Sequence, residues 1–305
     1  MKQVYNKIRS KAIDWLFRVA YMIKPRYAAD IMYQRAFKRR MDLEHPKNLI
    51  EKINWMQFNS DTTMWTLCAD KYRMREYVTE KGFQDYLPKL YGHWENPDEI
   101  NFAELPDEFV LKSNNGCGTV KIVSDKTQLD IPATKKLLRS WLKPYGYVGG
   151  QSHYLRIKPC IIAEELLHQD EDEKVFSPTS LVDYKMWCFN GEPESFFVAF
   201  NRHNTFFVNM ALFDANWKPL SQYLRNTNME TYDPQAYIPK PVCLDKMLDI
   251  ARKISSPFPE LRLDFYVING KPIIGEMTFT SGYGYFTDEY YEYLGSKVDL
   301  SKVKR

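Results

Sequence analysis

Two apolar runs joined by an Asn-Gly pair constrain the fold of this chain more than any other feature. Residues 261–268 and 272–277 have the apolar composition of β-strands. The Asn-Gly pair at 269–270 favours a tight turn, because both residue types tolerate a positive φ. The sequence therefore predicts an antiparallel hairpin in the last sixth of the chain.

Four polar residues on this hairpin suggest a metal site. Side chains alternate along a strand, so Arg262 and Asp264 share one face, and Glu276 and Thr278 share a face of the returning strand. The turn pairs the strands so that Asp264 and Glu276 can meet, which gives an oxygen-rich site suited to Mg²⁺. Arg262 beside them could neutralise a phosphate or an anionic intermediate. The alternative, from these residues alone, is an ordinary Arg–Asp pair on a solvated face.

A lysine followed by a glycine loop is the second signal. The apolar run 109–112 ends in Lys112, and the polar loop 113–119 contains Asn115, Gly116 and Gly118 before a second strand. Glycines let a backbone close on phosphates, and the lysine supplies positive charge. The loop lacks the spacing of a P-loop, and an ordinary hairpin turn is the alternative.

Two acids and a further lysine follow in an informative order. Glu164 and Glu165 end an apolar strand, where they could accept hydrogen bonds from an adenine amino group or ribose hydroxyls. Lys185 lies on a strand of alternating character, and its alternative is a plain surface lysine. Together with the earlier signals, the series supplies a phosphate clamp, a nucleoside contact, a second clamp and a metal site.

The composition is that of a globular protein with a mixed fold. The 305 residues are 44 % hydrophobic and 27 % charged, enough for one large or two ordinary domains. Helical patterns dominate up to about residue 82, and the last of them predicts a helix over about 64–81. A strand is expected over 86–91 and further strands after about 105, which indicates the α+β class. The five cysteines are odd in number and lack CxxC spacing, so we expect reduced thiols. With no apolar stretch of membrane-spanning length and no signal peptide, we expect an intracellular, cytoplasmic protein.

Charge is distributed unevenly. Residues 1–40 contain eleven lysines or arginines and only two acids, whereas the rest of the chain has more acids than bases. This pattern argues against a general nucleic-acid-binding protein. Residues 3–23 predict an amphipathic helix with an apolar sector that includes Trp15, Met22 and Ile23. The helix either docks on the body of the protein, or lies against the inner face of an anionic membrane or meets a membrane-bound partner, and the sequence leaves both readings open.

Several segments together resemble the TupA-like ATP-grasp proteins, which are named for teichuronopeptide biosynthesis and occur in bacterial surface-polysaccharide loci. The resemblance covers about residues 40–295. It is carried by 48–55 (NLIEKINW), 69–73 (ADKYR), 109–118 (FVLKSNNGCG), 162–165 (IAEE), 183–191 (DYKMWCFNG), 262–266 (RLDFY) and 275–280 (GEMTFT).

The resemblance implies a fold and a set of site residues. ATP would bind between two α+β subdomains, with the glycine loop as a movable lid. Lys71, Lys112 and Lys185 would contact ATP, Glu164 and Glu165 would hold the adenosine, Asp264 and Glu276 would bind Mg²⁺, and Arg262 and Lys185 would be catalytic. Thr278 stands where such enzymes commonly have Asn, so we expect one Mg²⁺ rather than two. We expect a helical basic segment at 1–60, a part with the lid at 61–167 and a subdomain with the metal site at 168–305.

The implied reaction joins a carboxylate to an amine through an acylphosphate. The family setting suggests a uronic acid of a surface glycan as the carboxylate and an amino acid as the amine. Arg202, His203 and Thr278 are candidates for binding the acidic substrate. The alternatives are a sugar kinase or a glycosyltransferase of the same loci, and a degenerate, non-catalytic assembly protein.

Overall fold

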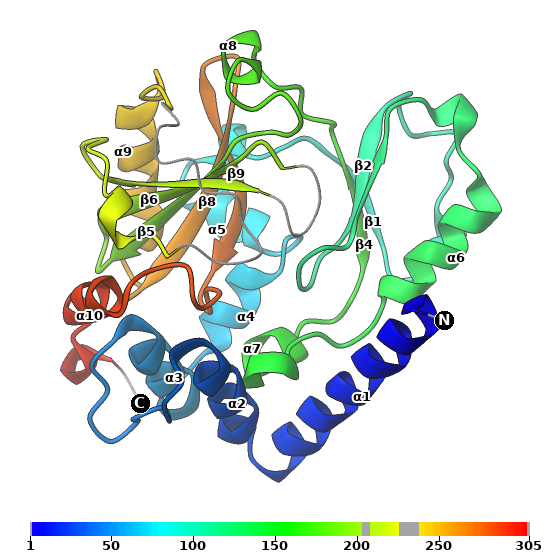
Figure 1. Ribbon diagram of the computed structural model, residues 1–305. Coiled ribbons are helices and arrows are strands. Elements are labelled where there is room, and N and C mark those ends of the chain that lie inside the picture. The colour runs from blue at the N-terminus through cyan, green and yellow to red at the C-terminus, as the bar shows by residue number, and fades with distance from the viewer. Residues whose placement is uncertain (1, 203–207, 226–237, 304–305) are drawn as a thin grey trace.

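The computed structural model describes residues 2–202, 208–225 and 238–303, and in these the chain forms two antiparallel sheets (Figure 1). The first sheet has the order β1-β4-β2-β3, and the second has the order β7-β6-β5-β8-β9. The strands are β1 Leu90–Trp94, β2 Phe109–Ser113, β3 Val120–Val123, β4 Ile161–Glu164, β5 Asp183–Phe189, β6 Glu192–Phe200, β7 Asn209–Asp214, β8 Leu261–Ile268 and β9 Lys271–Thr278.

Helices cover the sheets and form a layer beneath them in Figure 1. The α-helices are α1 Lys2–Ile23, α2 Pro25–Phe37, α3 Leu49–Asn59, α4 Thr63–Ala69, α5 Met74–Glu80, α6 Ile131–Trp141, α7 Ser152–Leu155, α8 Glu171–Lys174, α9 Leu244–Ser255 and α10 Asp288–Ser296. A short 3-10 turn, η4 (Val148–Gly150), precedes α7. Helix α9 packs on β5, β6 and β8, and its apolar side chains belong to the large core.

The β8–β9 hairpin confirms the strongest sequence prediction. Asn269 and Gly270 both have positive φ, 53° and 68°, as a tight turn between twisted strands requires. Asp264 lies opposite Glu276, and Arg262 lies opposite Thr278. The register then shifts by one residue at Gly275, where an added Cβ would lie 2.9 Å from the ring of Tyr266. This bulge sits directly beside the two acids.

The helix expected over about 64–81 is two helices, α4 and α5. The chain breaks after Ala69 because the buried Asp70 accepts hydrogen bonds from the backbone N–H groups of Tyr72 and Arg73, at 2.9 and 3.2 Å. The break brings Lys71 to the first sheet, where its N–H donates to the carbonyl of Asn114 at 3.0 Å. The strand expected over 86–91 begins later, at Leu90, and α10 was missed.

Helix α1 confirms the predicted helix but not the face on which it would dock. It packs through Phe17, which is 4 % exposed, and through Tyr21, whose hydroxyl lies 2.9 Å from that of Ser152. Trp15 and Ile23, from the predicted apolar sector, point to solvent instead. No helix in the described ranges combines the length and the apolar character needed to cross a membrane. All five cysteines are free thiols, as expected.

Candidate active site

The charged cluster on the second sheet is centred on Asp264. Neighbouring strands carry its partners, since Lys185 on β5 is the register partner of Asp264 on β8. Arg262 donates from Nε to Oδ1 at 2.7 Å and from Nη2 to Oδ2 at 2.8 Å, and Lys185 Nζ donates to Oδ2 at 2.7 Å. Lys185 Nζ also lies 2.5 Å from Oδ2 of Asp183, an acid whose role the sequence analysis missed.

These contacts favour the ionised forms of Asp264 and Lys185 despite burial. Burial alone would raise the pKa of Asp264, but Arg262 and Lys185 outweigh it and hold that pKa below its ordinary value. Burial would likewise lower the pKa of Lys185, but the carboxylates of Asp183 and Asp264 raise it. The site therefore presents fixed positive and negative charges on one face of the sheet, as charge stabilisation of a transferring group requires.

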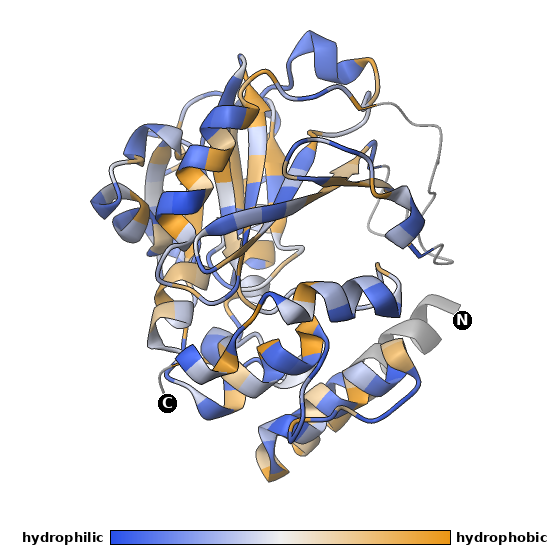
Figure 2. Cartoon of the chain, turned by 90° about the vertical axis from the view of Figure 1, so that its left-hand side faces the viewer, coloured by the Kyte–Doolittle hydropathy of each residue, from blue (hydrophilic) through white to orange (hydrophobic). Residues whose placement is uncertain are grey.

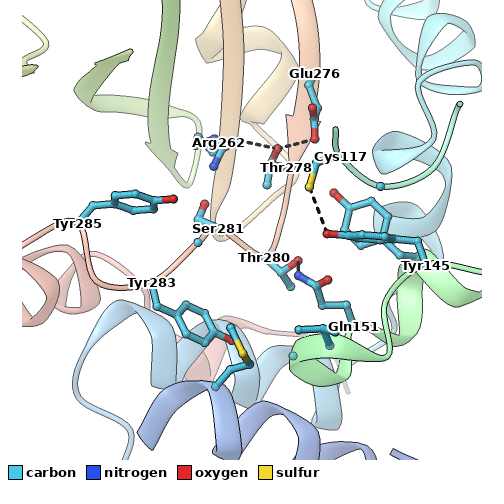
Figure 3. Close-up of a pocket in the computed structure, with 16 residues that line it drawn as sticks. Cys117, Tyr145, Gln151, Arg262, Glu276, Thr278, Thr280, Ser281, Tyr283 and Tyr285 are labelled. Carbon is cyan, nitrogen blue, oxygen red and sulfur yellow. Dashed lines mark hydrogen bonds between the residues drawn. The ribbon is translucent and has the colours of Figure 1, made fainter. Parts of the chain in front are cut away.

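Glu276 connects this cluster to the rest of the site (Figure 3). Arg262 Nη2 donates to Thr278 Oγ1 at 3.1 Å, and Thr278 Oγ1 donates to Glu276 Oε1 at 3.2 Å. The other Glu276 oxygen lies 3.7 Å from Lys71 Nζ, which also donates to the carbonyl of Gly116 at 2.6 Å. Lys71 thus joins the glycine loop to the hairpin that carries the two acids.

Lys112 and Glu164 form a second charged cluster, on the first sheet. Lys112 Nζ donates to Glu164 Oε2 at 2.8 Å, and Arg75 Nη1 donates to Oε1 at 3.1 Å. The Glu164 side chain is 5 % exposed, so both cations neutralise a buried charge. Glu165 instead accepts from the N–H of Lys89 at 2.8 Å. Arg75 was missed, although a buried acid at a strand end demands a cationic partner somewhere in the chain.

The glycine loop between β2 and β3 is held at several points. The side chain of Asn115 is buried and donates to the carbonyl of Lys143 at 2.9 Å. Gly116 and Gly118 have φ of 75° and 76°, in the left-handed region. A Cβ at Gly116 would lie 2.6 Å from the ring of Tyr145, whereas one at Gly118 would meet nothing within 4 Å.

A cavity of about 290 Å³ lies between the glycine loop and the hairpin. Figure 3 shows side chains from both sides of it, and Gln151 donates to Thr280 across its lower end at 2.8 Å. Ser281 is 2 % exposed, and its hydroxyl has no hydrogen-bond partner in the described part of the chain. The lining residues are Met32, Gly116, Cys117, Tyr145, Val148, Gly149, Gln151, Tyr154, Arg262, Glu276, Thr278, Thr280, Ser281, Gly282, Tyr283 and Tyr285.

The predicted substrate residues are not gathered in one place. Thr278 lines the cavity. Arg202 is exposed and is absent from the cavity lining; its N–H donates to the hydroxyl of Ser180 at 2.9 Å. The positive charge of Arg202 partly offsets the rise in the pKa of Tyr266, which lies on the same strand as Asp264. His203 lies outside the described residues. Tyr145 and Tyr154 of the cavity were not predicted, because they come from a segment far from the hairpin in the sequence.

The donor set fits a Mg²⁺ ion that also binds phosphate oxygens. No group of three or more His, Cys, Asp or Glu side chains in the described residues could hold a metal by itself. Asp264 and Glu276 offer two carboxylates as cross-strand neighbours. Mg²⁺ in nucleotide sites is commonly held by one or two carboxylates, with substrate phosphates and water completing its octahedron.

Comparison with solved structures finds ligases and a synthetase at low similarity. A D-alanine–D-alanine ligase from Bacillus anthracis is 18 % identical, with 78 % of this chain and 68 % of that chain covered and a TM-score of 0.47. The ATP complex of the Bacillus anthracis enzyme is 15 % identical, with 73 % and 57 % covered and a TM-score of 0.42. An ADP complex of N5-carboxyaminoimidazole ribonucleotide synthetase is 14 % identical, with 76 % and 51 % covered and a TM-score of 0.45.

The chain thus spans between about half and two thirds of the length of these structures. No curated protein matches it. The family model described as TupA-like ATP-grasp matches residues 51–299, so the chain belongs to the TupA-like ATP-grasp family. This result confirms the expected ATP-grasp fold.

Proposed function

We propose that this protein is an ATP-dependent ligase that joins a carboxylate to an amine. The observation that carries the proposal is the position of the cavity, which is bounded by Gly116 and Cys117 of the glycine loop and by Arg262, Glu276 and Thr278 of the hairpin. A substrate held there would lie beside both the proposed phosphate-binding loop and the proposed metal ligands. Such proximity is what a phosphoryl transfer from ATP to a bound carboxylate requires.

The site residues have distinct proposed roles, and the first group binds ATP. Lys71, Lys112 and Lys185 neutralise the phosphates of ATP, and the backbone of Asn115, Gly116 and Gly118 closes over them. Glu164, the last residue of β4, and Glu165 directly after it lie beside the nucleoside. We assign Glu164 a second role as well. Its carboxylate pairs with Arg75 and Lys112, and the pair with Lys112 orients the lysine side chain toward the phosphates.

Arg262 is the proposed catalytic group for the transferred phosphate, with Lys185 beside it. Its guanidinium lies in the cavity wall and already contacts Asp264 and Thr278, so it is oriented before any substrate binds. Asp264 and Glu276 would hold Mg²⁺, which neutralises negative charge on the phosphates when it is bound. One ion is proposed, because Thr278 occupies the position of a usual further ligand.

The proposed reaction proceeds in two steps. An oxygen of the substrate carboxylate attacks the γ-phosphorus of ATP, the bond to the β–γ bridging oxygen breaks, and ADP leaves, which gives an acylphosphate. The amine nitrogen then attacks the acyl carbon, phosphate leaves, and the nitrogen loses a proton, which gives the amide. The cavity walls exclude water from the acylphosphate between the steps.

The proposed acceptor is a uronic acid of a bacterial surface glycan, and the proposed amine is an amino acid. The family setting supports this choice. The lining also supports it, because the faces of Tyr145, Tyr283 and Tyr285 and the hydroxyls of Thr280 and Ser281 suit a polyhydroxylated acid. Arg202 and His203 are further candidates for the acidic group, and the use of ATP favours a cytoplasmic enzyme.

A paired-substrate screen tests the proposal. ADP release is measured with uronic acids and amino acids in all combinations, and products are identified by mass spectrometry. We expect ADP release that needs both substrates and falls to background in Asp264→Asn. If no pair exceeds the Asp264→Asn background, the ligase proposal is wrong. A stable phosphorylated sugar formed without an amine would support the sugar kinase instead, and glycosyl transfer without ADP release would support a glycosyltransferase.

A further inference from the structure

Over residues 12–23, whose side chains the structure describes, helix α1 has two apolar faces, and one of them is left uncovered. Phe17 packs inward at 4 % exposure, and the ring of Tyr21 meets that of Tyr147 edge-on at 5.3 Å. On the other side Trp15, Leu16, Met22 and Ile23 are 62 %, 56 %, 81 % and 70 % exposed. At 100° per residue these four lie within a sector of roughly 120°. Four large apolar side chains on one exposed helical face form a hydrophobic patch, and such a patch marks a surface that binds a membrane or another molecule.

The surroundings of this patch are cationic. Within residues 12–40 there are seven lysines or arginines and two acids. One of these acids, Asp30, already accepts from the N–H of Met41 at 3.0 Å and from Gln34 at 2.8 Å. Lys24 and Arg26 follow directly after the apolar patch and are exposed.

A hollow at the same end of α1 combines charge with apolar surface. It has a volume of about 400 Å³ and is lined by Lys24, Arg26 and one acid, Glu44, over Leu43, Trp55 and Phe58 among others. A cation-rimmed hollow next to an apolar patch matches the chemistry of an anionic headgroup above acyl chains. Figure 2 shows the described part of α1 at the edge of the molecule, with hydrophobic segments along it.

We propose that Trp15, Leu16, Met22 and Ile23, together with Lys24 and Arg26, dock on the surface of an anionic lipid bilayer. A helix with an apolar face that bears Trp and with flanking lysine and arginine side chains lies in the interface of such a membrane. The cations are attracted to an anionic surface, and burial of the apolar side chains among the lipids adds to the binding. A second copy of this chain would cover the apolar face but leave the cations facing each other.

The docking surface and the proposed acceptor cavity are built on elements that pack against each other. Helices α1 and α2 pack against η4, where a Cβ at Gly150 would lie 2.4 Å from the carbonyl oxygen of Pro25. Val148 and Gly149 of η4 and Met32 of α2 also line the cavity. Docking would therefore hold the acceptor cavity at the bilayer, and this consequence rests on the proposed function.

Flotation with lipid vesicles tests the surface itself. The full-length protein is mixed with vesicles of phosphatidylcholine alone or with phosphatidylglycerol added. We expect binding to the anionic vesicles that weakens as salt is raised. Trp15→Ala with Ile23→Glu should weaken it roughly tenfold or more. Lys24→Glu with Arg26→Glu should weaken it by at least roughly fivefold for each side chain.

The matched control is Ile122→Glu, since Ile122 on β3 is 63 % exposed, close to the 70 % of Ile23. Circular dichroism and melting establish that each variant folds. Absence of binding to anionic vesicles, or equal losses in Ile23→Glu and Ile122→Glu, would overturn the proposal. So would a dimer in solution that Ile23→Glu converts to monomer. Asp264→Asn should bind vesicles as the wild type does, so failure of the ligase proposal is distinguishable from failure of this one.

Discussion

Arg262 holds Asp264 by two hydrogen bonds, Nε to Oδ1 at 2.7 Å and Nη2 to Oδ2 at 2.8 Å. The contact joins the proposed phosphate-binding group to a proposed metal ligand on the same face of β8. Asp264 is buried, so its ionised state depends on the charge of Arg262 beside it. Changes at this pair should therefore affect catalysis and folding together, and the two effects have to be measured separately.

Asp264→Asn should remove most of the activity while keeping the fold. The amide fills the same space but carries no charge, so it binds Mg²⁺ poorly and leaves Arg262 and Lys185 without their shared anion. We expect ADP release to fall roughly 100-fold or more. The melting temperature, compared at equal pH, shows whether folding also suffers. Glu95→Gln, in an exposed pair with Lys158, is the control, and a variant that turned over like this control would contradict the assigned role.

Glu164→Gln should weaken ATP binding more than turnover. Lys112 and Arg75 would lose the buried carboxylate that orients them, at 2.8 and 3.1 Å. Leaving partly buried cations unpaired costs on the order of 2–3 kcal/mol of stability, and KM for ATP should rise roughly tenfold. A double-mutant cycle with Lys112→Met separates positioning from bulk charge. Purely additive effects on KM would mean that Glu164 does not act through Lys112.

Gly116→Ala should impair activity more than Gly118→Ala. The two glycines have nearly the same φ, so each substitution carries about 1–2 kcal/mol of backbone strain. Only at Gly116 would the new Cβ meet a neighbour, the Tyr145 ring at 2.6 Å, so only there must the loop also move. Steady-state kinetics with ATP as the varied substrate measures the difference. Tyr145→Ala should restore part of the loss in Gly116→Ala, and no rescue would exclude the steric explanation.

Sequence reasoning was most successful where the determining contacts are local. The pairing of Asp264 with Glu276 follows from a two-residue turn and the alternation of strand side chains, so the amino-acid sequence alone predicts it. Lys112 at the end of β2 and the glycine loop after it are likewise local.

The missed residues depend on contacts between distant segments. Arg75 reaches Glu164 across 89 positions, and Asp70 breaks a helix whose pattern looks continuous. Helix α1 was predicted correctly, but the face that docks was not, because apolar residues occur on both of its sides. The choice between them depends on the shape of the 147–152 segment, which Tyr21 contacts through Tyr147 and Ser152.

Glu173 provides a test of pH dependence away from the site. Burial raises its pKa to about 7, from 4.5, although the hydroxyl of Tyr184 donates to Oε1 at 2.7 Å and partly offsets burial. As pH rises, the unfolded state therefore loses the carboxyl proton of Glu173 at a lower pH than the folded state does. Its contribution to stability is fully present below about pH 4.5 and is lost as pH rises through about 7. Glu173→Gln cannot lose a proton, so it should become more stable than the wild type above pH 7.

The size and the control of this effect follow from the same linkage. The difference in unfolding free energy between Glu173→Gln and the wild type should grow by up to about 3 kcal/mol from acid to alkaline pH. Melting temperatures of both proteins across pH 5–8 measure it. Glu171→Gln on the same helix α8 is the matched control, because that side chain is 85 % exposed and should change the pH dependence little. If the melting temperatures of Glu173→Gln and the wild type depended on pH in the same way, Glu173 would be ionised in the folded protein. Its Oε2, which has no hydrogen-bond partner among the described residues, would then have a partner in solution.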